Sequence, residues 1–254
     1  MLLKPLKKAV ENGDRIQAVI LGSAVNNDGH TMGLTTPNIE GQKSVIRQAL
    51  RNSAISPDSI SYYEAHGTGT LLGDPIEIRA ASQLYRELTS DVQYCGVGSV
   101  KANMGHLLRA AGIGSFIKAV LAVQHGVMPK SIHCEKPHPR FQFKQSPFYP
   151  VMESKAWEGI NGKRRSAISS FGFGGTNCHM IIENFTGEHF PGYLLLRQPL
   201  QPPNFNKKVY WLGKSAVEEQ EHFYKRLLAQ LQSGDITPEQ ALQMELQALK
   251  GEFV

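Results

Sequence analysis

Two histidines in glycine-rich segments are the residues of this sequence best suited to chemistry. His66 lies in YYEAHGTGT, at residues 62–70, and His106 ends GSVKANMGH, at residues 98–106. A neutral imidazole exchanges protons near pH 7, and its N–H group can stabilise a developing negative charge. A third segment, SSFGFGGTN at residues 169–177, has glycines that allow the backbone to approach a substrate closely. Because each segment follows an expected strand, the three predict a site at strand ends.

Each segment taken alone also has a structural interpretation. A histidine after a strand is more often a hydrogen-bonded structural residue than a catalyst, and glycine-rich loops often only supply positive φ. Neither GTGTLLG nor GFGGTN fits the dinucleotide-binding or phosphate-loop pattern. Nucleotide binding is therefore rejected.

The elements that must position these segments alternate between strands and helices. Buried strands are expected at residues 15–25, 60–67 and 92–99, and a strand pair around a turn at 165–184. Helices are expected at residues 38–55, 74–88 and 106–126, the second capped by Asp74 with Pro75 at its first position. This alternation indicates an α/β architecture with parallel and antiparallel strands.

Together, the motifs resemble the β-ketoacyl synthases, specifically the ketosynthase domains of modular polyketide synthases. Three segments stand in the order of that family: EAHGTGTLLGDPIE, GSVKANMGH with AAGIGSFIK, and SSFGFGGTNCHMIIE. Three further segments match the stretches between them: GSAVNNDG, GLTTPN and HGVMPKSIH. The resemblance covers about residues 1–185 and implies the C-terminal half of the thiolase-like condensing-enzyme fold, an α/β fold with a mixed sheet between helical layers.

The resemblance implies decarboxylative condensation of an acyl thioester, held on a cysteine, with a malonyl thioester. His66 and His106 would face that cysteine, polarise the malonyl thioester carbonyl and assist loss of CO₂. Lys101 would support His106 electrostatically. Two imidazole N–H groups directed at the enolate oxygen would make the step feasible without a metal, and no metal site is expected.

The glycine-rich turn is implied to serve the acyl group. The backbone N–H of Phe173 would stabilise the tetrahedral intermediate, and Phe171 and Phe173 would border the acyl channel. Gly174 and Gly175 belong to the same turn.

No cofactor is expected to bind directly, because the substrates of the family are carried on the phosphopantetheine arm of an acyl carrier protein. Thr68 and Thr70 would meet that arm. With no acyltransferase motif in the sequence, malonyl units are expected from an enzyme that acts separately.

The nucleophile is the missing part of the motif set. Cys95, Cys134 and Cys178 are widely spaced without a CxxC pair, which argues against disulfides and zinc, and all three are expected to be structural thiols. The cysteine is therefore expected from an N-terminal ketosynthase half on another chain, with a split gene favoured over a truncated fragment. The complete domain is expected to be homodimeric.

The C-terminal region differs in composition from the rest. Residues 186–214 predict a linker that wraps back, burying the aromatic residues of YWL at 210–212, and residues 215–254 predict two helices broken at SGD. Thr237 and Gln240 predict a capping box for the second helix. The apolar stripes of this tail favour equally an exposed hairpin and a docking element.

Composition excludes some function classes. The 254 residues are 41% hydrophobic and carry a net charge of +5 from scattered bases, which indicates a globular protein and not a nucleic-acid-binding one. No apolar run is long enough to span a bilayer and the N-terminus does not fit a signal peptide, so a cytoplasmic protein without membrane partners is expected.

Two alternatives to a condensing enzyme remain. Leu108 and Arg109 stand where many polyketide ketosynthases have a Glu and a small residue, so a non-elongating or non-catalytic ketosynthase-like scaffold in a polyketide assembly line is the second hypothesis. A hydrolase that uses Ser169 or Ser170 with a histidine is a third, disfavoured because the sequence has no nucleophile elbow.

Overall fold

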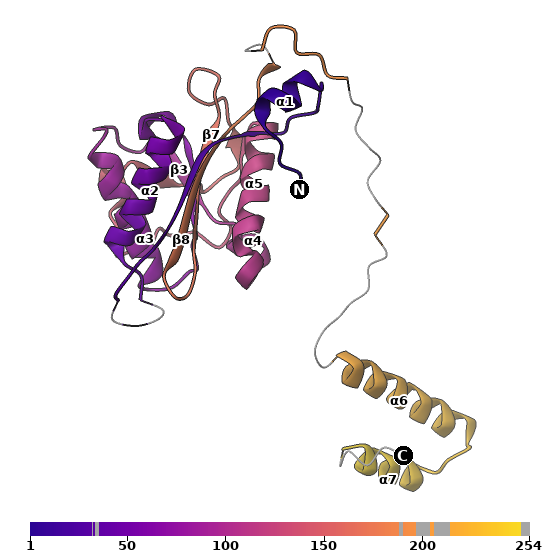
Figure 1. The fold of residues 1–254 in the computed structure, drawn as a ribbon. Helices are drawn as coiled ribbons and strands as arrows, with labels where there is room; N and C mark the ends of the chain where they lie inside the picture. The colour runs from indigo at the N-terminus through magenta and orange to yellow at the C-terminus, as the bar shows by residue number, and fades with distance from the viewer. Residues whose placement is uncertain (32, 34–35, 188–189, 197–203, 206–213, 250–254) are drawn as a thin grey trace. The chain divides into compact units, whose positions relative to one another are not determined.

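The computed structural model describes residues 1–31, 33, 36–187, 190–196, 204–205 and 214–249. The chain divides into two compact units, Met1–Pro199 and Leu200–Val254. The first unit contains a mixed sheet with helices on both of its faces (Figure 1). No helix of the described residues is long and apolar enough to cross a membrane.

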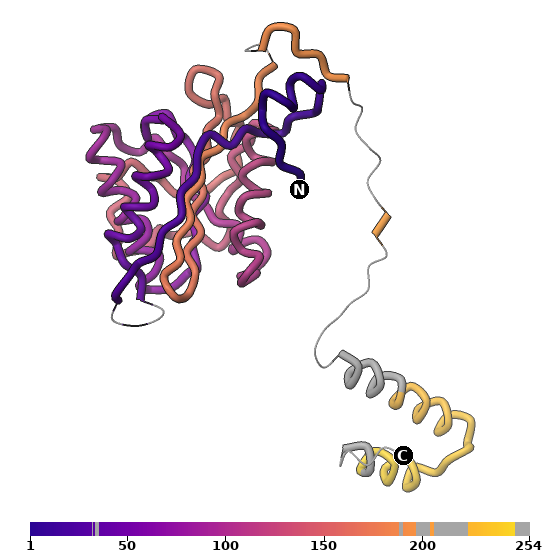
Figure 2. The backbone as a smooth tube through the Cα atoms, viewed as in Figure 1, coloured from indigo at the N-terminus to yellow at the C-terminus, as the bar shows by residue number. Residues whose placement is uncertain are grey.

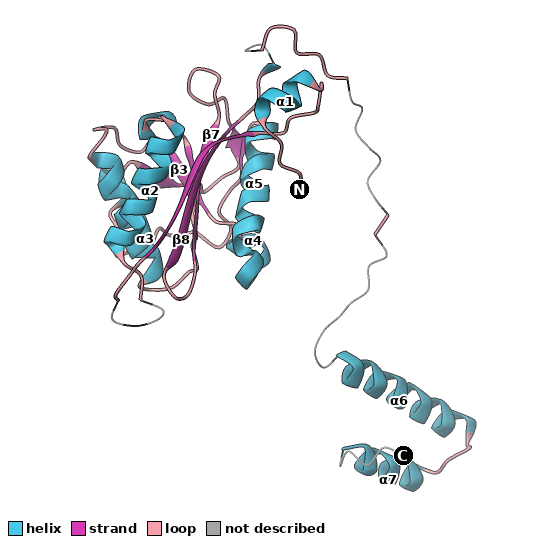
Figure 3. Ribbon diagram, in the orientation of Figure 1, coloured by secondary structure: helices cyan, strands magenta, loops and turns pink. Residues whose placement is uncertain are grey.

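The sheet of the first unit has six strands in the order β1-β8-β7-β2-β3-β5. Figure 3 draws the strands in magenta. Their bounds are Val19–Asn27 for β1, Tyr62–Glu64 for β2, Cys95–Gly98 for β3, Phe148–Pro150 for β5, Arg165–Phe171 for β7 and Thr176–Glu183 for β8. Strand β2 pairs in parallel with β3 and β7, whereas β8 pairs antiparallel with β7 and β1. The expected mixed sheet is therefore confirmed.

Helices cover the sheet in two layers (Figure 1). Their bounds are Ile39–Ser53 for α2 and Gly73–Arg86 for α3 on one face, and Ala111–His125 for α5 on the other. Two short helices, α1 (Leu6–Glu11) and α4 (Lys101–Met104), and a small sheet of β4 (Val127–Met128) and β6 (Lys155–Ala156) complete the unit.

Each face of the sheet has its own apolar core. Toward α2 and α3, the rings of Tyr63 and Tyr85 both pack against Phe148, with centroids 5.3 and 5.1 Å away. Toward α5, Tyr62 packs against Trp157 at 5.7 Å. Since Tyr62 and Tyr63 are neighbours in one strand, the alternation of side chains along β2 builds both cores.

Two sequence expectations are wrong in detail. Strand β1 is not buried: Ala24 is its only buried residue and Val25 is 68% exposed, because β1 lies at the sheet edge and pairs with β8 alone. Asp74 does not cap α3, which begins at Gly73; its Oδ1 accepts the N–H of Gly69 at 3.0 Å instead.

The expected helix at 106–126 begins later, at Ala111. A short 3₁₀ turn, Leu108–Ala110, precedes it, and Leu108 has φ of +51°. A left-handed residue cannot continue an α-helix, so the chain bends here and His106 lies outside the helix.

The second unit contains a helical hairpin of α6 (Lys214–Ser233) and α7 (Pro238–Leu249), whose middle part is yellow in Figure 2. The predicted capping box is present: Thr237 N–H donates to Gln240 Oε1 at 2.9 Å and Gln240 N–H donates to Thr237 Oγ1 at 3.3 Å. Leu227 and Ala241 are buried. The YWL segment, predicted to wrap back, lies outside the described residues.

Candidate active site

The three glycine-rich segments meet at the carboxyl ends of strands β2, β3 and β7. His66 follows β2 by two residues, Lys101 follows β3 by three, and Phe171 ends β7. Because β2 is parallel with both neighbours, the carboxyl ends of these strands lie side by side. The sheet topology therefore brings together residues that are up to 105 positions apart in sequence.

The two histidines lie edge to face. Their ring centroids are 5.7 Å apart and their planes make an angle of 83°. The ring of Phe171 lies 5.7 Å from His66 on another side. His66 is partly buried, whereas His106 is exposed in the described chain.

Backbone hydrogen bonds hold both rings in the same tautomer. The Phe171 N–H donates to Nδ1 of His66 at 3.3 Å, and the Leu108 N–H donates to Nδ1 of His106 at 3.0 Å. A backbone N–H can only donate, so each Nδ1 is the acceptor and the proton of a neutral ring lies on Nε2. The positive φ of Leu108 belongs to the bend that makes the second bond. Both imidazoles thus present an Nε2–H donor.

The electrostatics keep these imidazoles neutral. Burial, the Lys101 ammonium and the neighbouring His106 together lower the pKa of His66 to about 3. Partial burial and Lys101 lower the pKa of His106 as well. At neutral pH the pair offers two uncharged N–H donors, which suits stabilisation of an oxyanion without a fixed positive charge.

Lys101 lies closer to His66 than the sequence interpretation implied. Its Nζ contacts the backbone oxygen of His66 and lies 3.5 Å from Nδ1 of the same ring. Its charge lowers the pKa of His106, but its direct contacts are with His66.

Glu77 is a site residue that the sequence analysis did not identify. It lies in α3, and its two carboxylate oxygens accept the backbone N–H groups of His66 at 2.8 Å and Gly67 at 2.9 Å. The side chain is buried, at 3% exposure. The signal that could have found it is an acidic residue in the second turn of a helix, α3, that directly follows a glycine-rich histidine loop.

The pKa of Glu77 allows the contact between its carboxyl group and the His66 loop to be tested by changing the pH. Burial raises its pKa to about 7 from the usual 4.5, against two backbone hydrogen bonds that lower it. In the unfolded chain the Glu77 carboxyl group loses its proton at about pH 4.5, whereas in the folded chain it keeps its proton up to about pH 7. The Glu77 contribution therefore lowers stability as the pH rises through this window, by roughly 3 kcal/mol in full, and stays constant above it.

The measurement is the free energy of unfolding in urea for the parent and for Glu77→Gln, at about pH 5 and about pH 8. Glutamine does not titrate, so its constant cost cancels between the two pH values. We expect the parent to lose stability relative to Glu77→Gln at the higher pH. If the difference in unfolding free energy between the parent and Glu77→Gln were the same at both pH values, this would contradict a buried, hydrogen-bonded carboxyl group.

The glycine-rich turn that joins β7 to β8 leaves Phe173 exposed, at 78%. The Phe173 N–H makes no hydrogen bond within the described residues, so it is free to serve a ligand. Gly174 and Gly175 have φ of +86° and +82°, and a Cβ on Gly175 would lie 2.9 Å from Asp28 Cβ. Glycine is required there because both the backbone conformation and the space exclude a side chain.

Thr68 and Thr70 lie in the loop after His66, with their Oγ1 atoms 3.4 Å apart. Thr70 Oγ1 also accepts the N–H of Gly73, at 3.0 Å, at the start of α3. Thr70 is exposed and Thr68 is partly exposed.

None of the three cysteines has the features of a nucleophile. Cys95 is buried within β3, and burial raises the pKa of its thiol. The pKa values of Cys134 and Cys178 are also raised, chiefly by burial. A reactive thiol needs a lowered pKa, so all three fit structural roles.

The serine–histidine pair that the disfavoured hydrolase would use lies in the interior of the fold. Ser169 Oγ lies 2.8 Å from Nδ1 of His179 and 2.7 Å from the Tyr63 hydroxyl, but all three side chains are fully buried. Burial lowers the pKa of His179 to about 3. The pair is inaccessible to a substrate, which argues against hydrolysis through Ser169. Among the described residues, no group of three or more His, Cys, Asp or Glu side chains is placed to hold a metal.

Comparison with known proteins identifies the family of one part of the chain. Residues 17–135 match the family described as beta-ketoacyl synthase, C-terminal domain. These residues belong to the β-ketoacyl synthase family. The polyketide synthase PksN of Bacillus subtilis is 41% identical over 239 residues, which cover 90% of this chain and 4% of PksN. A phenolphthiocerol/phthiocerol polyketide synthase polypeptide of Mycobacterium tuberculosis is 47% identical over 183 residues, which cover 72% of this chain and 12% of that polypeptide.

Solved ketosynthases share the fold of the first unit. The ketosynthase from module 6 of the bacillaene synthase of Bacillus subtilis is 42% identical, with a TM-score of 0.70 over 72% of this chain. Ketosynthase twelve of the bacillaene synthase in Bacillus amyloliquefaciens is 44% identical, also with a TM-score of 0.70. The predicted thiolase-like fold is confirmed. The chain spans 34% and 33% of these two ketosynthase chains.

Proposed function

We propose that this chain carries the histidine-bearing part of a polyketide ketosynthase that condenses acyl and malonyl thioesters with loss of CO₂. The observation that carries the proposal is the convergence of two neutral imidazoles, His66 and His106, whose Nε2–H groups make no hydrogen bond within the described residues. The nucleophilic cysteine comes from a ketosynthase segment outside residues 1–254, on the same longer polypeptide or on a separate chain.

The chemistry follows from what the two rings offer. When malonyl thioester loses CO₂, the carbon–carbon bond to the carboxylate breaks and its electron pair forms an enolate. The Nε2–H groups of His66 and His106 donate to the enolate oxygen as its charge develops. Each fixed donor of this kind is worth about 2.7–4 kcal/mol in the transition state.

The enolate carbon then forms a bond with the acyl carbon held on the cysteine. The carbonyl electrons move to oxygen, where the Phe173 N–H stabilises the tetrahedral intermediate, and collapse expels the cysteine as a thiolate. We assign the loop of Thr68 and Thr70 as the contact for a phosphopantetheine arm, so an acyl carrier protein is the proposed donor of both substrates.

The exposed apolar side of α5 supports the proposal that a further ketosynthase segment covers this helix. Ile113, Ile117 and Leu121 lie along one side of this helix and are each about half exposed, while the opposite side is buried. A helix that is apolar on both sides is typical of a buried position between two layers. The solved ketosynthases are about three times the matched length, so they contain further chain of the kind that could form this second layer.

The test joins residues 1–254 to a cysteine-bearing ketosynthase segment and follows two steps separately. The first is acylation of the cysteine from an acyl carrier protein, and the second is formation of the β-ketoacyl product from malonyl carrier protein. We expect both. An acylated cysteine that never condenses would contradict the proposal and favour a non-elongating ketosynthase, and a folded complex that is never acylated would favour a scaffold.

A further inference from the structure

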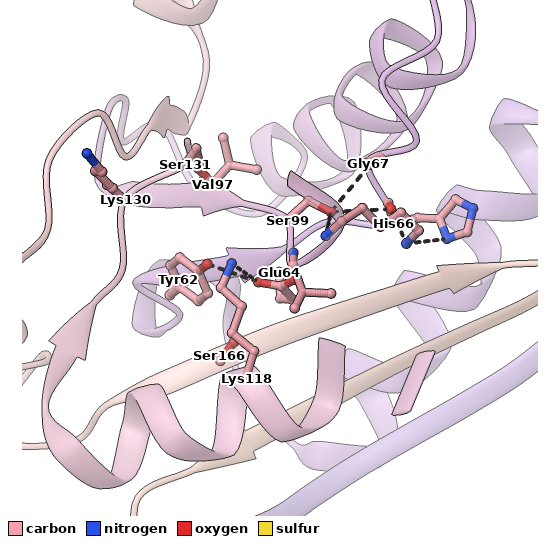
Figure 4. Close-up of polar contacts among 12 residues, drawn as sticks. Tyr62, Glu64, His66, Gly67, Val97, Ser99, Lys118, Lys130, Ser131 and Ser166 are labelled. Atoms are coloured by element: carbon pink, nitrogen blue, oxygen red, sulfur yellow. Dashed lines mark hydrogen bonds and ion pairs between the residues drawn. The ribbon is translucent and has the colours of Figure 1, made fainter. Parts of the chain in front are cut away.

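A buried ion pair that the proposed chemistry does not use lies beside the histidines. Glu64 is the last residue of β2, two residues before His66, and is fully buried. Its Oε2 lies 2.9 Å from Nζ of Lys118 on α5, whose side chain is 13% exposed (Figure 4). Burying two charges is unfavourable unless further hydrogen bonds satisfy them. The burial of the Glu64–Lys118 ion pair at this position therefore needs an explanation.

The Glu64 carboxylate joins three segments of the chain. Its Oε1 accepts the backbone N–H of Val100 at 2.6 Å, and its Oε2 accepts the hydroxyl of Tyr62 at 3.0 Å. Glu64 thus connects β2, the segment after β3 and, through Lys118, helix α5. Burial raises the pKa of Glu64, and the Lys118 ammonium is the largest influence opposing this shift.

Val100 connects the Glu64 carboxylate to the candidate active site. It immediately precedes Lys101, whose Nζ contacts His66, and it begins the segment that ends at His106. Val100 is the N-cap residue of α4, and within the described residues the Glu64 carboxylate is the acceptor of its N–H. Ser99 adds a second tie, since its Oγ donates to the Gly67 oxygen at 3.3 Å (Figure 4).

Resting on the proposed function, we propose that the Glu64–Lys118 ion pair is a positioning device for condensation. Glu64 fixes Val100 and, through it, the segment that carries Lys101 and His106. Lys118 holds the Glu64 carboxylate in place from α5. Neither side chain touches the substrate; both act through the position of His106 relative to His66.

The first variant is Glu64→Gln in the complete ketosynthase. It keeps the size of the side chain but loses the charge and turns an amide group toward the Lys118 ammonium. Because a misplacement of about 1 Å can cost about 100-fold in rate, we expect kcat of condensation to fall by about that factor. Acylation of the cysteine and the KM for malonyl carrier protein should change little, since neither requires the two N–H groups to converge.

A matched control separates positioning from stability. Glu183→Gln breaks the ion pair between Glu183 Oε2 and Arg165 Nε, 2.6 Å apart, whose side chains are 16% and 13% exposed. This pair joins β8 to β7 at the ends of the strands away from Phe171. We expect Glu183→Gln to lower the melting temperature as Glu64→Gln does, without slowing condensation per folded molecule.

A double variant tests the role of Lys118. In Glu64→Gln with Lys118→Met no ammonium faces the amide, whose oxygen can still accept the Val100 N–H. We expect kcat to recover by about tenfold over Glu64→Gln alone. Failure to recover would overturn the role of Lys118.

The same assay distinguishes this inference from the proposed function. A parent-like kcat for Glu64→Gln, with His106→Ala strongly impaired, would overturn the positioning role and leave the function intact. A parent-like kcat for His106→Ala would overturn the function itself.

Discussion

Replacing His66 or His106 by alanine is expected to slow condensation by about 10²- to 10³-fold in the complete ketosynthase. Each substitution removes one Nε2–H donor from the enolate oxygen and leaves the other in place. Acylation of the cysteine should persist, because that step uses the thiolate and the Phe173 N–H instead. The measurement is CO₂ release from malonyl carrier protein beside the rate of acylation.

Two further variants sharpen this prediction. Asparagine at position 106 keeps an N–H donor, so His106→Asn should retain more activity than His106→Ala. His125→Ala changes an exposed histidine at the far end of α5 and should leave both steps at the parent rate. Parent-like CO₂ release from both His66→Ala and His106→Ala would show that these imidazoles do not stabilise the enolate.

Introducing a charge on the exposed side of α5 should prevent assembly of the ketosynthase. Ile117 is 45% exposed in the described chain, on the side that we propose another ketosynthase layer covers. A buried carboxylate without a partner costs about 3–5 kcal/mol, so Ile117→Asp should destabilise the complete enzyme by that amount. Cysteine acylation should be lost with it. Urea unfolding and the acylation assay measure the two effects.

Ser44→Asp is the matched control, because it places the same charge on an exposed position of α2, across the sheet from α5. It should leave stability within about 0.5 kcal/mol of the parent. Parent-like stability and acylation in Ile117→Asp would mean that this side of α5 remains in water in the complete enzyme.

Much of the site could be predicted because its chemistry lies in short segments after strands. His66 follows a strand, Phe171 ends one and His106 lies in the segment that begins after β3. The alternation of helices and strands indicates parallel neighbours whose ends must meet. The positions of the three segments in space follow from that topology. The motif residues therefore indicate one shared site from their sequence alone.

Other features depend on packing that no local pattern records. Strand β1 is as apolar as a central strand, and only its place at the sheet edge decides its exposure. Glu77 resembles any acidic residue near the start of a helix until the fold buries it under the His66 loop. The tautomer of His106 depends on the left-handed conformation of Leu108, which no residue pattern predicts.

The most direct test of the central claim is the nitrogen NMR spectrum of the His66 and His106 side chains in the complete ketosynthase at neutral pH. The account predicts two neutral rings, each with its proton on Nε2 and an unprotonated Nδ1. A charged ring, or a proton on Nδ1 of either histidine, would contradict it.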